Sequence, residues 1–318
     1  MKKTLLLYGG RSPEHDVSCE SAAFLTRALR ERGCSLFPVY IDRRGGMTYA
    51  DTQEPLTLCY EKGRLSLRFR DGQRFFPEQA ILLLHGTYGE DGAWQGLLTL
   101  ASLPFIGADI RASALAMHKP TTKRLAIAAG VPALPFCLPH SAEEAEAAFP
   151  YPIMIKPASG GSSLGIGKAV CRDSLIHALA QAQKYGEVMA EPFLNAREVS
   201  VAVYQKAGDL VASPVGEVRK KGELFDYDTK YCHAEDDLLC PAPLSRSLSE
   251  QIRLSALTLC RLFGIKDMAR ADFFIDKDGK VYFNEINTLP GYTEHSLYPR
   301  LLTAAGVDPL FPFEEAFR

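Results

Sequence analysis

The sequence predicts a mixed α/β and α+β chain built from more than one domain. Its 318 residues exceed the roughly 100–200 residues of an ordinary domain, so two or three domains are expected. Near the N-terminus, short apolar strands alternate with a helical pattern, which is typical of a parallel α/β sheet. Near the C-terminus, two alternating apolar runs flank a charged turn containing glycine, which indicates an antiparallel β-hairpin.

The first domain is predicted to begin with a buried strand. Residues Lys3 to Tyr8 are mostly apolar and end at Gly9-Gly10, too early for a signal peptide or a membrane span. A helical pattern follows from Val17 to Arg30. Further strands are predicted at 36–41 and 81–84, with antiparallel strands over the irregular segment 45–76.

A domain boundary is predicted near residues 103–107, and the chain beyond it changes character. A glycine- and serine-rich loop runs from Lys156 to Gly167, between apolar segments. The predicted elements are one or two helices at 113–129, strands at 153–156 and 188–193, strand and helix at 170–184, strands at 198–204 and 210–216, and a helix at 248–263.

The hairpin carries the densest chemistry in the chain. Side chains alternate along a strand, so Arg270, Asp272 and Phe274 share one face, while Glu285 and Asn287 share one face of the second strand. If the two faces coincide, carboxylate and carboxamide oxygens form a site for Mg²⁺, beside a cation that can hold phosphate. The alternative is a solvated face with a salt bridge.

Two segments nearby are suited to binding phosphate and a nucleotide base. The loop after Lys156 exposes backbone N–H groups and hydroxyls, although it matches neither a P-loop nor a dinucleotide fingerprint. A lysine closing an apolar strand can reach phosphates, whereas the loop alone could be a flexible surface hairpin. The segment Glu191 to Leu194 could pair with an adenine edge, but most Glu-Pro pairs are only turns.

Charge and cysteine content narrow the function classes. The net charge of −2 and the lack of a basic run argue against a nucleic-acid-binding platform. Eight cysteines are scattered without a Cys-x-x-Cys pair, and Cys232-His233 lacks partners at zinc spacing. We interpret the cysteines as reduced thiols of a cytosolic protein.

Taken together, these pieces resemble the nucleotide site of the ATP-grasp superfamily, and more narrowly the D-alanine–D-alanine ligases. The motifs span nearly the whole chain, from about residue 9 to about residue 300. They are Gly9-Gly10-x-Ser12-x-Glu14, His85-Gly86-x-x-Gly89-Glu90-Asp91-Gly92, Lys156-Pro157 with Gly161-Ser162-Ser163, Phe225-Asp226-Tyr227 with Thr229-Lys230-Tyr231, and Glu285-Ile286-Asn287-Thr288-x-Pro290-Gly291 with His295-Ser296-Leu297.

The resemblance implies an ATP-grasp fold and an enzymatic activity. We expect an N-terminal parallel α/β substrate-binding domain at 1–107, a central lid domain at 108–196 and a C-terminal antiparallel-sheet catalytic domain at 197–318. Such ligases phosphorylate one D-alanine with ATP, and the amine of a second D-alanine attacks the acyl phosphate. The product is used in peptidoglycan precursor synthesis. The resemblance also implies that the enzyme is cytoplasmic and a homodimer.

The resemblance also implies which residues hold ATP and its metal ions. Asp272, Glu285 and Asn287 are expected to hold two Mg²⁺ or Mn²⁺ ions that bridge the phosphates. The other expected ATP ligands are Lys119 and Lys156 at the phosphates, Glu191, Phe193 and Leu194 at adenine, Glu198 at ribose, and Ser163, Asn284 and Glu285.

The amino acid subsites follow in the same way. Glu14 is expected to bind the first ammonium group, supported by His85 and Glu90, although each could be a structural residue in isolation. Arg270 and the Gly291 N–H would stabilise the tetrahedral oxyanion. Ser296 and Leu297 would face the second amino acid, and Lys230 would reach the transferred phosphate. Ser162 and Tyr231 would form a triad with Glu14 that closes the lid, which is expected to consist of residues 225–231.

Departures from the family pattern leave alternative functions open. His118 stands where an aspartate is usual, Pro192 replaces a lysine, and Tyr292 replaces a methionine. Aromatic residues at that last position occur in relatives that use D-serine or D-lactate, so Tyr292 and Leu297 are expected to determine the second substrate. An ATP-binding sensor without ligase activity is the alternative from another class.

Overall fold

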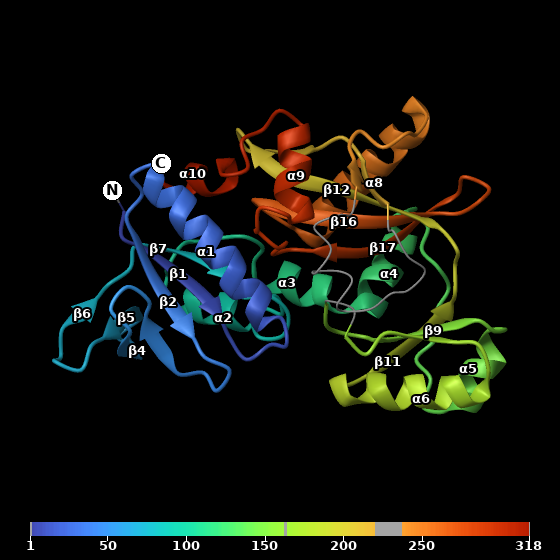
Figure 1. Ribbon diagram of the computed structural model, residues 1–318, viewed down its shortest axis with the longest axis horizontal. Coiled ribbons are helices and arrows are strands. Elements are labelled where there is room, and N and C mark those ends of the chain that lie inside the picture. The colour runs from blue at the N-terminus through green and yellow to red at the C-terminus, as the bar shows by residue number, and fades with distance from the viewer. Residues whose placement is uncertain (1, 162–163, 220–236, 318) are drawn as a thin grey trace.

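The computed structural model describes residues 2–161, 164–219 and 237–317, and the strands among them form three sheets (Figure 1). The first sheet lies at one end of the molecule, the three-stranded sheet at the other, and the third sheet along one side between them (Figure 1). No helix in these ranges has both the length and the apolar character needed to cross a membrane.

Four adjacent strands of the first sheet are parallel, as the strand–helix alternation predicted. Leu6 of its central strand packs with Leu25 in one core cluster, and Leu5 packs with Leu98 in another. Neighbouring side chains point to opposite faces, so helices cover both sides of the sheet. These elements are β1 (Thr4–Gly9), β2 (Leu36–Ile41), β7 (Gln79–Leu83), β8 (Phe105–Ile106), α1 (His15–Glu31) and α2 (Ala93–Leu100).

Antiparallel strands extend this sheet beyond β2, which confirms the prediction for segment 45–76. The sheet order is β6-β5-β4-β3-β2-β1-β7-β8. The added strands are β3 (Met47–Tyr49), β4 (Glu54–Glu61), β5 (Arg64–Arg68) and β6 (Arg74–Phe75).

The second sheet is small and antiparallel. Ile153 and Ile155 face a core formed with Leu175 and Leu179, so one face is covered by helices, as α5 and α6 show in Figure 1. Its elements are β10 (Gly167–Ala169), β9 (Ile153–Pro157) and β11 (Val188–Pro192), with α5 (Ala142–Ala148), α6 (Arg172–Ala182) and the 3₁₀ turn η1 (Gln183–Tyr185).

The third sheet contains the predicted hairpin and is antiparallel throughout the described residues. Val201 and Phe283 pack against Phe263 in its main core cluster. Its strands are β15 (Asp237–Leu239), β14 (Gly216–Arg219), β12 (Arg197–Lys206), β16 (Met268–Ile275), β17 (Val281–Asn287) and β13 (Asp209–Ala212), and the nearby helices are α3 (Ile110–Met117), α4 (Lys119–Ala128), α8 (Arg246–Phe263), α9 (Leu297–Ala304) and α10 (Phe311–Phe317).

The predicted elements are observed, with two corrections. The strand expected at the start of segment 170–184 lies earlier, because β10 ends at Ala169 and the segment itself holds α6 and η1. The segment 210–216 was expected to be one strand, but β13 ends at Ala212 and β14 begins at Gly216. Pro214 lies between them and has no N–H to donate to a strand ladder, which explains the break. The domain limits remain predictions.

Candidate active site

The hairpin of β16 and β17 is paired so that its polar residues meet. Arg270 pairs with Asn287 and Asp272 pairs with Glu285. Directly opposite residues in an antiparallel pair point to the same face of the sheet. The polar faces of the two hairpin strands, which the sequence could not place relative to each other, are therefore the same face of the sheet.

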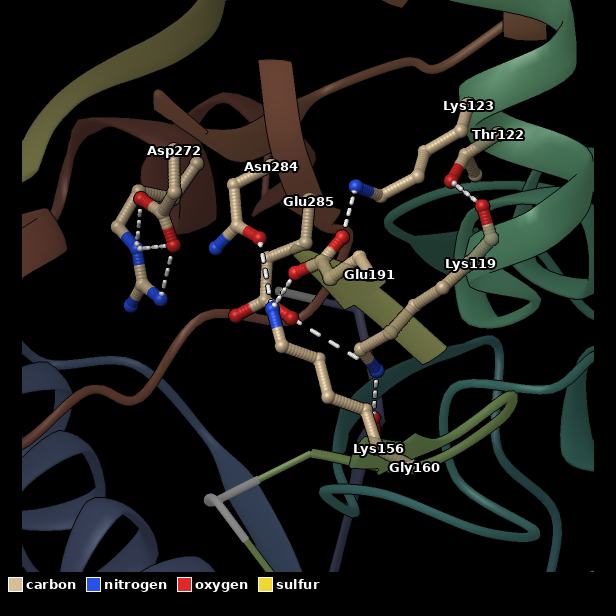
Figure 2. A network of polar contacts seen from close by, with 10 residues as sticks. Lys119, Thr122, Lys123, Lys156, Gly160, Glu191, Asp272, Asn284 and Glu285 are labelled. Atoms are coloured by element: carbon tan, nitrogen blue, oxygen red, sulfur yellow. Dashed lines mark hydrogen bonds and ion pairs between the residues drawn. The ribbon is translucent and has the colours of Figure 1, made fainter. Parts of the chain in front are cut away.

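A β-bulge adds one more residue to this face. The register passes from Asp272 opposite Glu285 to Phe273 opposite Phe283, which leaves Asn284 as the extra residue. Strict alternation would put Asn284 and Glu285 on opposite faces. Because of the bulge, both side chains point toward the same space, and Figure 2 shows them side by side.

The side chain of Asp272 is held by two neighbours. The guanidinium of Arg270 donates from Nε to Oδ1 at 2.9 Å and from Nη2 to Oδ2 at 2.8 Å. The hydroxyl of Ser200, which is directly opposite on β12, donates to Oδ1 at 2.6 Å. Ser200 was not predicted, because strand alternation alone does not show which residue of another strand will lie opposite.

Two lysines reach over this face from other elements. Lys156, near the end of β9, has its Nζ 3.5 Å from Asn284 Oδ1. Lys119 begins α4, and its Nζ lies 3.7 Å from Glu285 Oε2 while donating to the Gly160 carbonyl of the glycine-rich loop. The structure thus brings together the predicted phosphate lysines and the predicted metal ligands (Figure 2).

The carboxylate of Glu191 lies between two lysines. Oε1 contacts Lys156 and Oε2 contacts Lys123, and all three side chains are almost fully buried. Burial alone would raise the pKa of Glu191, but the charges of Lys156 and Lys123 lower it below its ordinary value. Any contact with adenine would therefore fall to the Glu191 backbone. Sequence reasoning missed Lys123, whose one available signal is its spacing four residues after Lys119 on a helix.

The predicted adenine and ribose residues lie along the adjoining strands. Phe193 follows β11, and the Nζ of Lys168, a residue not predicted, lies 3.8 Å from the centre of its ring. Leu194 follows and is partly exposed. Glu198 is on β12, opposite Phe274 of the hairpin. Glu198 borders the face over which the two lysines reach, since Lys156 Nζ lies 5.7 Å from the centre of the Phe274 ring.

Glu14 is buried at the meeting point of two loops. A Cβ added to Gly86 would lie 2.3 Å from Glu14 Oε2, and one added to Gly161 would lie 3.1 Å from either carboxylate oxygen. Only a residue without a side chain allows this close approach. The first sheet and the glycine-rich loop therefore approach each other closely at this carboxylate.

His85 and Glu90 connect the first sheet to the loop after the hairpin. His85 Nδ1 lies 2.9 Å from the Leu289 carbonyl oxygen, and Glu90 Oε1 accepts from the Leu289 N–H at 3.1 Å. Burial lowers the pKa of His85 to about 4, and burial together with the charge of Glu14 raises that of Glu90. Both residues fasten the loop, a role that their motif did not reveal.

The residues after the hairpin are divided between site and core. The Ser296 hydroxyl accepts from the Thr293 N–H at 2.9 Å and lies close to Gly291, where a Cβ would be 3.1 Å away. Leu297 begins α9 and is partly buried. Ser296 therefore lies beside Gly291, whereas Leu297 packs against the core cluster that contains Tyr292 and Tyr298.

The expectation for Tyr292 is wrong. Its side chain has no exposed surface, packs 4.7 Å from the Phe313 ring centre, and donates its hydroxyl to the Pro309 carbonyl. Backbone direction after Gly291 turns it into the core, so it does not line a second-substrate pocket. The His118 side chain likewise makes its contacts outside the candidate site. Its Nε2 lies 3.0 Å from the Glu187 carboxylate and its Nδ1 2.6 Å from the Thr121 hydroxyl.

Four predicted residues, Ser162, Ser163, Lys230 and Tyr231, lie outside the described residues, as does the predicted lid at 225–231. Asp272, Glu285 and Asn287 fit a hard divalent cation, because all three supply oxygen donors on one face. In the described ranges, no group of three His, Cys, Asp or Glu residues forms a metal site. The set has two carboxylates and one carboxamide, so further ligands would have to come from the phosphates of a substrate.

Known proteins are similar to this chain in sequence and architecture. Family models described as D-ala D-ala ligase N-terminus and D-ala D-ala ligase C-terminus match residues 3–108 and 137–310. The D-alanine–D-alanine ligase of Chlorobium phaeovibrioides is 37% identical over 333 residues, covering 95% of this chain and 92% of that protein.

Two solved structures extend the likeness to the fold. D-alanyl-alanine synthetase A from Vibrio cholerae has a TM-score of 0.89 at 27% identity, covering 99% of this chain and 97% of that one. The VanG D-Ala:D-Ser ligase from Enterococcus faecalis has a TM-score of 0.85 at 28% identity, covering 99% and 98%.

Proposed function

The chain belongs to the D-alanine–D-alanine ligase family, and from that premise we propose how its residues join two D-alanines at the expense of ATP. The enzyme converts two D-alanines and ATP to D-alanyl-D-alanine, ADP and phosphate through an acyl phosphate, for peptidoglycan precursors. Its predicted ATP-grasp fold is confirmed by the structural matches.

One observation carries the assignment. The bulged hairpin places Asp272, Asn284 and Glu285 on one face, and Lys156 and Lys119 from two other elements reach Asn284 and Glu285 there. Oxygen donors below and ammonium groups above form a site for a polyphosphate and its counterions. A solvated salt-bridged hairpin, the alternative left open by the sequence, would not be covered by two buried lysines.

At the phosphates, Lys119 and Lys156 neutralise charge as the γ-phosphate approaches the anionic D-alanine carboxylate. Asp272, Glu285 and Asn287 would hold two Mg²⁺ or Mn²⁺ ions, which supply electrostatic neutralisation and orient the phosphates. Phe193, Leu194 and the Glu191 backbone would contact adenine, and Glu198 the ribose. Ser163 and Asn284 complete the proposed ATP ligands.

At the amino acids, Glu14 binds the ammonium of the first D-alanine, because its buried carboxylate faces the Gly86 backbone. The second amine attacks the acyl phosphate, and the negative charge on the resulting oxyanion is met by Arg270 and the Gly291 N–H. Ser296 and Leu297 face the second D-alanine. Lys230 would reach the transferred phosphate, and Ser162 and Tyr231 would close the lid with Glu14.

His85 and Glu90 act behind these groups. They hold the loop that presents Gly291, so they position the oxyanion donor rather than contact the oxyanion. We also propose a homodimer, and a cytoplasmic location where ATP is supplied. The domain limits at 107 and 196 belong to the same proposal.

Phosphate release tests the assignment. The enzyme is assayed with D-alanine as first substrate and D-alanine, D-serine or D-lactate as second, and D-alanine should give the highest kcat/KM at neutral pH. Preference for D-serine or D-lactate would contradict the substrate assignment. Asp272→Ala should abolish turnover, while Asp278→Ala, in the exposed turn of the same hairpin, should not. Full activity of Asp272→Ala would contradict the metal site.

A further inference from the structure

We propose that Lys123 is a positioning residue for the reaction, which acts through Glu191 to keep the charge of Lys156 available to the ATP phosphates. The inference rests on the proposed role of Lys156 as a phosphate ligand. Lys123 itself does not face the site. Its side chain is fully buried on α4, whereas Lys156 retains some exposed surface.

The geometry gives Glu191 two partners with different tasks. Its Oε2 contacts Lys123 and its Oε1 contacts Lys156, so one carboxylate joins a helix to two strands of the second sheet (Figure 2). The bond to Lys156 holds the lysine stem in place. Its ammonium then lies 3.5 Å from Asn284 Oδ1, on the face of the bulged hairpin.

The charge balance explains why a second lysine is needed. A carboxylate paired with one lysine forms a neutral pair and attracts that ammonium strongly in a buried setting. With Lys123 on its other oxygen, Glu191 is already neutralised. The trio keeps a net charge of about +1, because two ammonium groups share one carboxylate. Of the two lysines, Lys156 is the one that retains exposed surface and reaches the hairpin face, so it is the member that can present this charge to a ligand.

The structural alternative is that Lys123 only satisfies a buried carboxylate. Both ideas predict lower stability when Lys123 is removed, since breaking a buried ion pair leaves the other partner uncompensated. They differ in their effect on ATP. If Lys123 acts through charge, its loss lets Glu191 hold Lys156 more tightly and weakens ATP binding specifically.

The test compares KM values for ATP and D-alanine in Lys123→Met. We expect the KM for ATP to rise about tenfold, as one nearby charge at a protein dielectric would produce, with the KM for D-alanine unchanged. Arg124→Met is the matched control, because it removes a positive charge from the next, exposed position of α4 and should leave both values unchanged. A KM for ATP within about twofold of the wild type in a folded Lys123→Met would overturn the proposal.

A double variant keeps the proposal testable if Lys123→Met does not fold. Lys123→Met with Glu191→Gln removes both charges while keeping an oxygen that can accept from Lys156. We expect its KM for ATP to return to within about threefold of the wild type, because no carboxylate then competes with phosphate. A KM that stays about tenfold high would show that Lys123 acts in another way.

Lys156→Met separates this inference from the proposed function. It should raise the KM for ATP more than Lys123→Met does. If it leaves that KM unchanged, the phosphate role of Lys156 fails, and the inference fails with it. If Lys156→Met raises the KM and Lys123→Met does not, only the role of Lys123 is overturned.

Discussion

Acidification should destabilise this enzyme through one buried histidine. The Nδ1 of His85 donates to the Leu289 carbonyl at 2.9 Å, and the Ser21 hydroxyl donates to Nε2 at 3.3 Å while accepting from the Tyr292 N–H at 3.0 Å. Each proton in this chain of contacts has one place when the imidazole is neutral. A second ring proton would make Nε2 a donor, so the Ser21 hydroxyl would have to turn away and accept from Nε2 as well as from the Tyr292 N–H.

The size of the effect follows from the two pKa values. Burial lowers the pKa of His85 from 6.5 to about 4, with a further contribution from the charge of Arg270. The unfolded chain therefore binds a proton at a pH where the folded chain does not. Stability that is present above pH 6.5 is lost as the pH falls toward 4, by about 3 kcal/mol.

The wild type alone would not isolate this contribution. Burial and the charge of Glu14 raise the pKa of Glu90, so its contribution to stability has the opposite sign. That contribution is present at low pH and is lost as the pH rises through the raised pKa. Glu90 contributes equally to the pH dependence of stability in the wild type and in a His85 variant. The difference between the two proteins therefore isolates the contribution of His85.

Urea unfolding of the wild type and His85→Asn provides the measurement. The Asn amide can donate to Leu289 in place of Nδ1 but does not titrate. Between about pH 7.5 and about pH 4, the wild type should lose about 3 kcal/mol more than His85→Asn. His140→Asn, at an exposed position, is the control and should track the wild type. Equal losses in the wild type and His85→Asn would refute the reasoning.

Two further predictions concern the close approach at Glu14 and the buried Tyr292. Gly86→Ala should raise the KM for D-alanine more than the KM for ATP, because the added Cβ would lie 2.3 Å from Glu14 Oε2 at a backbone φ of +71°. Steady-state kinetics with each substrate varied in turn measure both values. An unchanged KM for D-alanine would contradict this prediction. Tyr292→Phe should lower the free energy of unfolding by about 0.5–1.5 kcal/mol, since the hydrogen bond to the partly buried Pro309 carbonyl is lost. The same variant should keep the preference of the enzyme among D-alanine, D-serine and D-lactate as second substrate. A changed preference would show that Tyr292 does influence the choice of second substrate.

The hairpin shows how much of the structure the local residue pattern predicts. Alternation of apolar and polar residues from Arg270 to Asn287 predicted both strands, the turn and the polar face, because strand geometry repeats every two residues. The cluster of oxygen donors and the two lysines beside it were also predicted, from residue type and motif, and the structure brings them together. Alternation could not reveal the bulge that turns Asn284 and Glu285 to one side.

By itself, the sequence determined the secondary structure, the residue types of the site and the family of the chain, since these depend on periodicity and on motifs read along one dimension. Tertiary structure alone decided which side chains share a carboxylate and which enter the core. Lys123 reaches Glu191 across 68 residues of sequence, and Tyr292 turns toward Phe313 rather than substrate. The physical reason is that such contacts depend on how separate elements pack, and no local repeat encodes that packing.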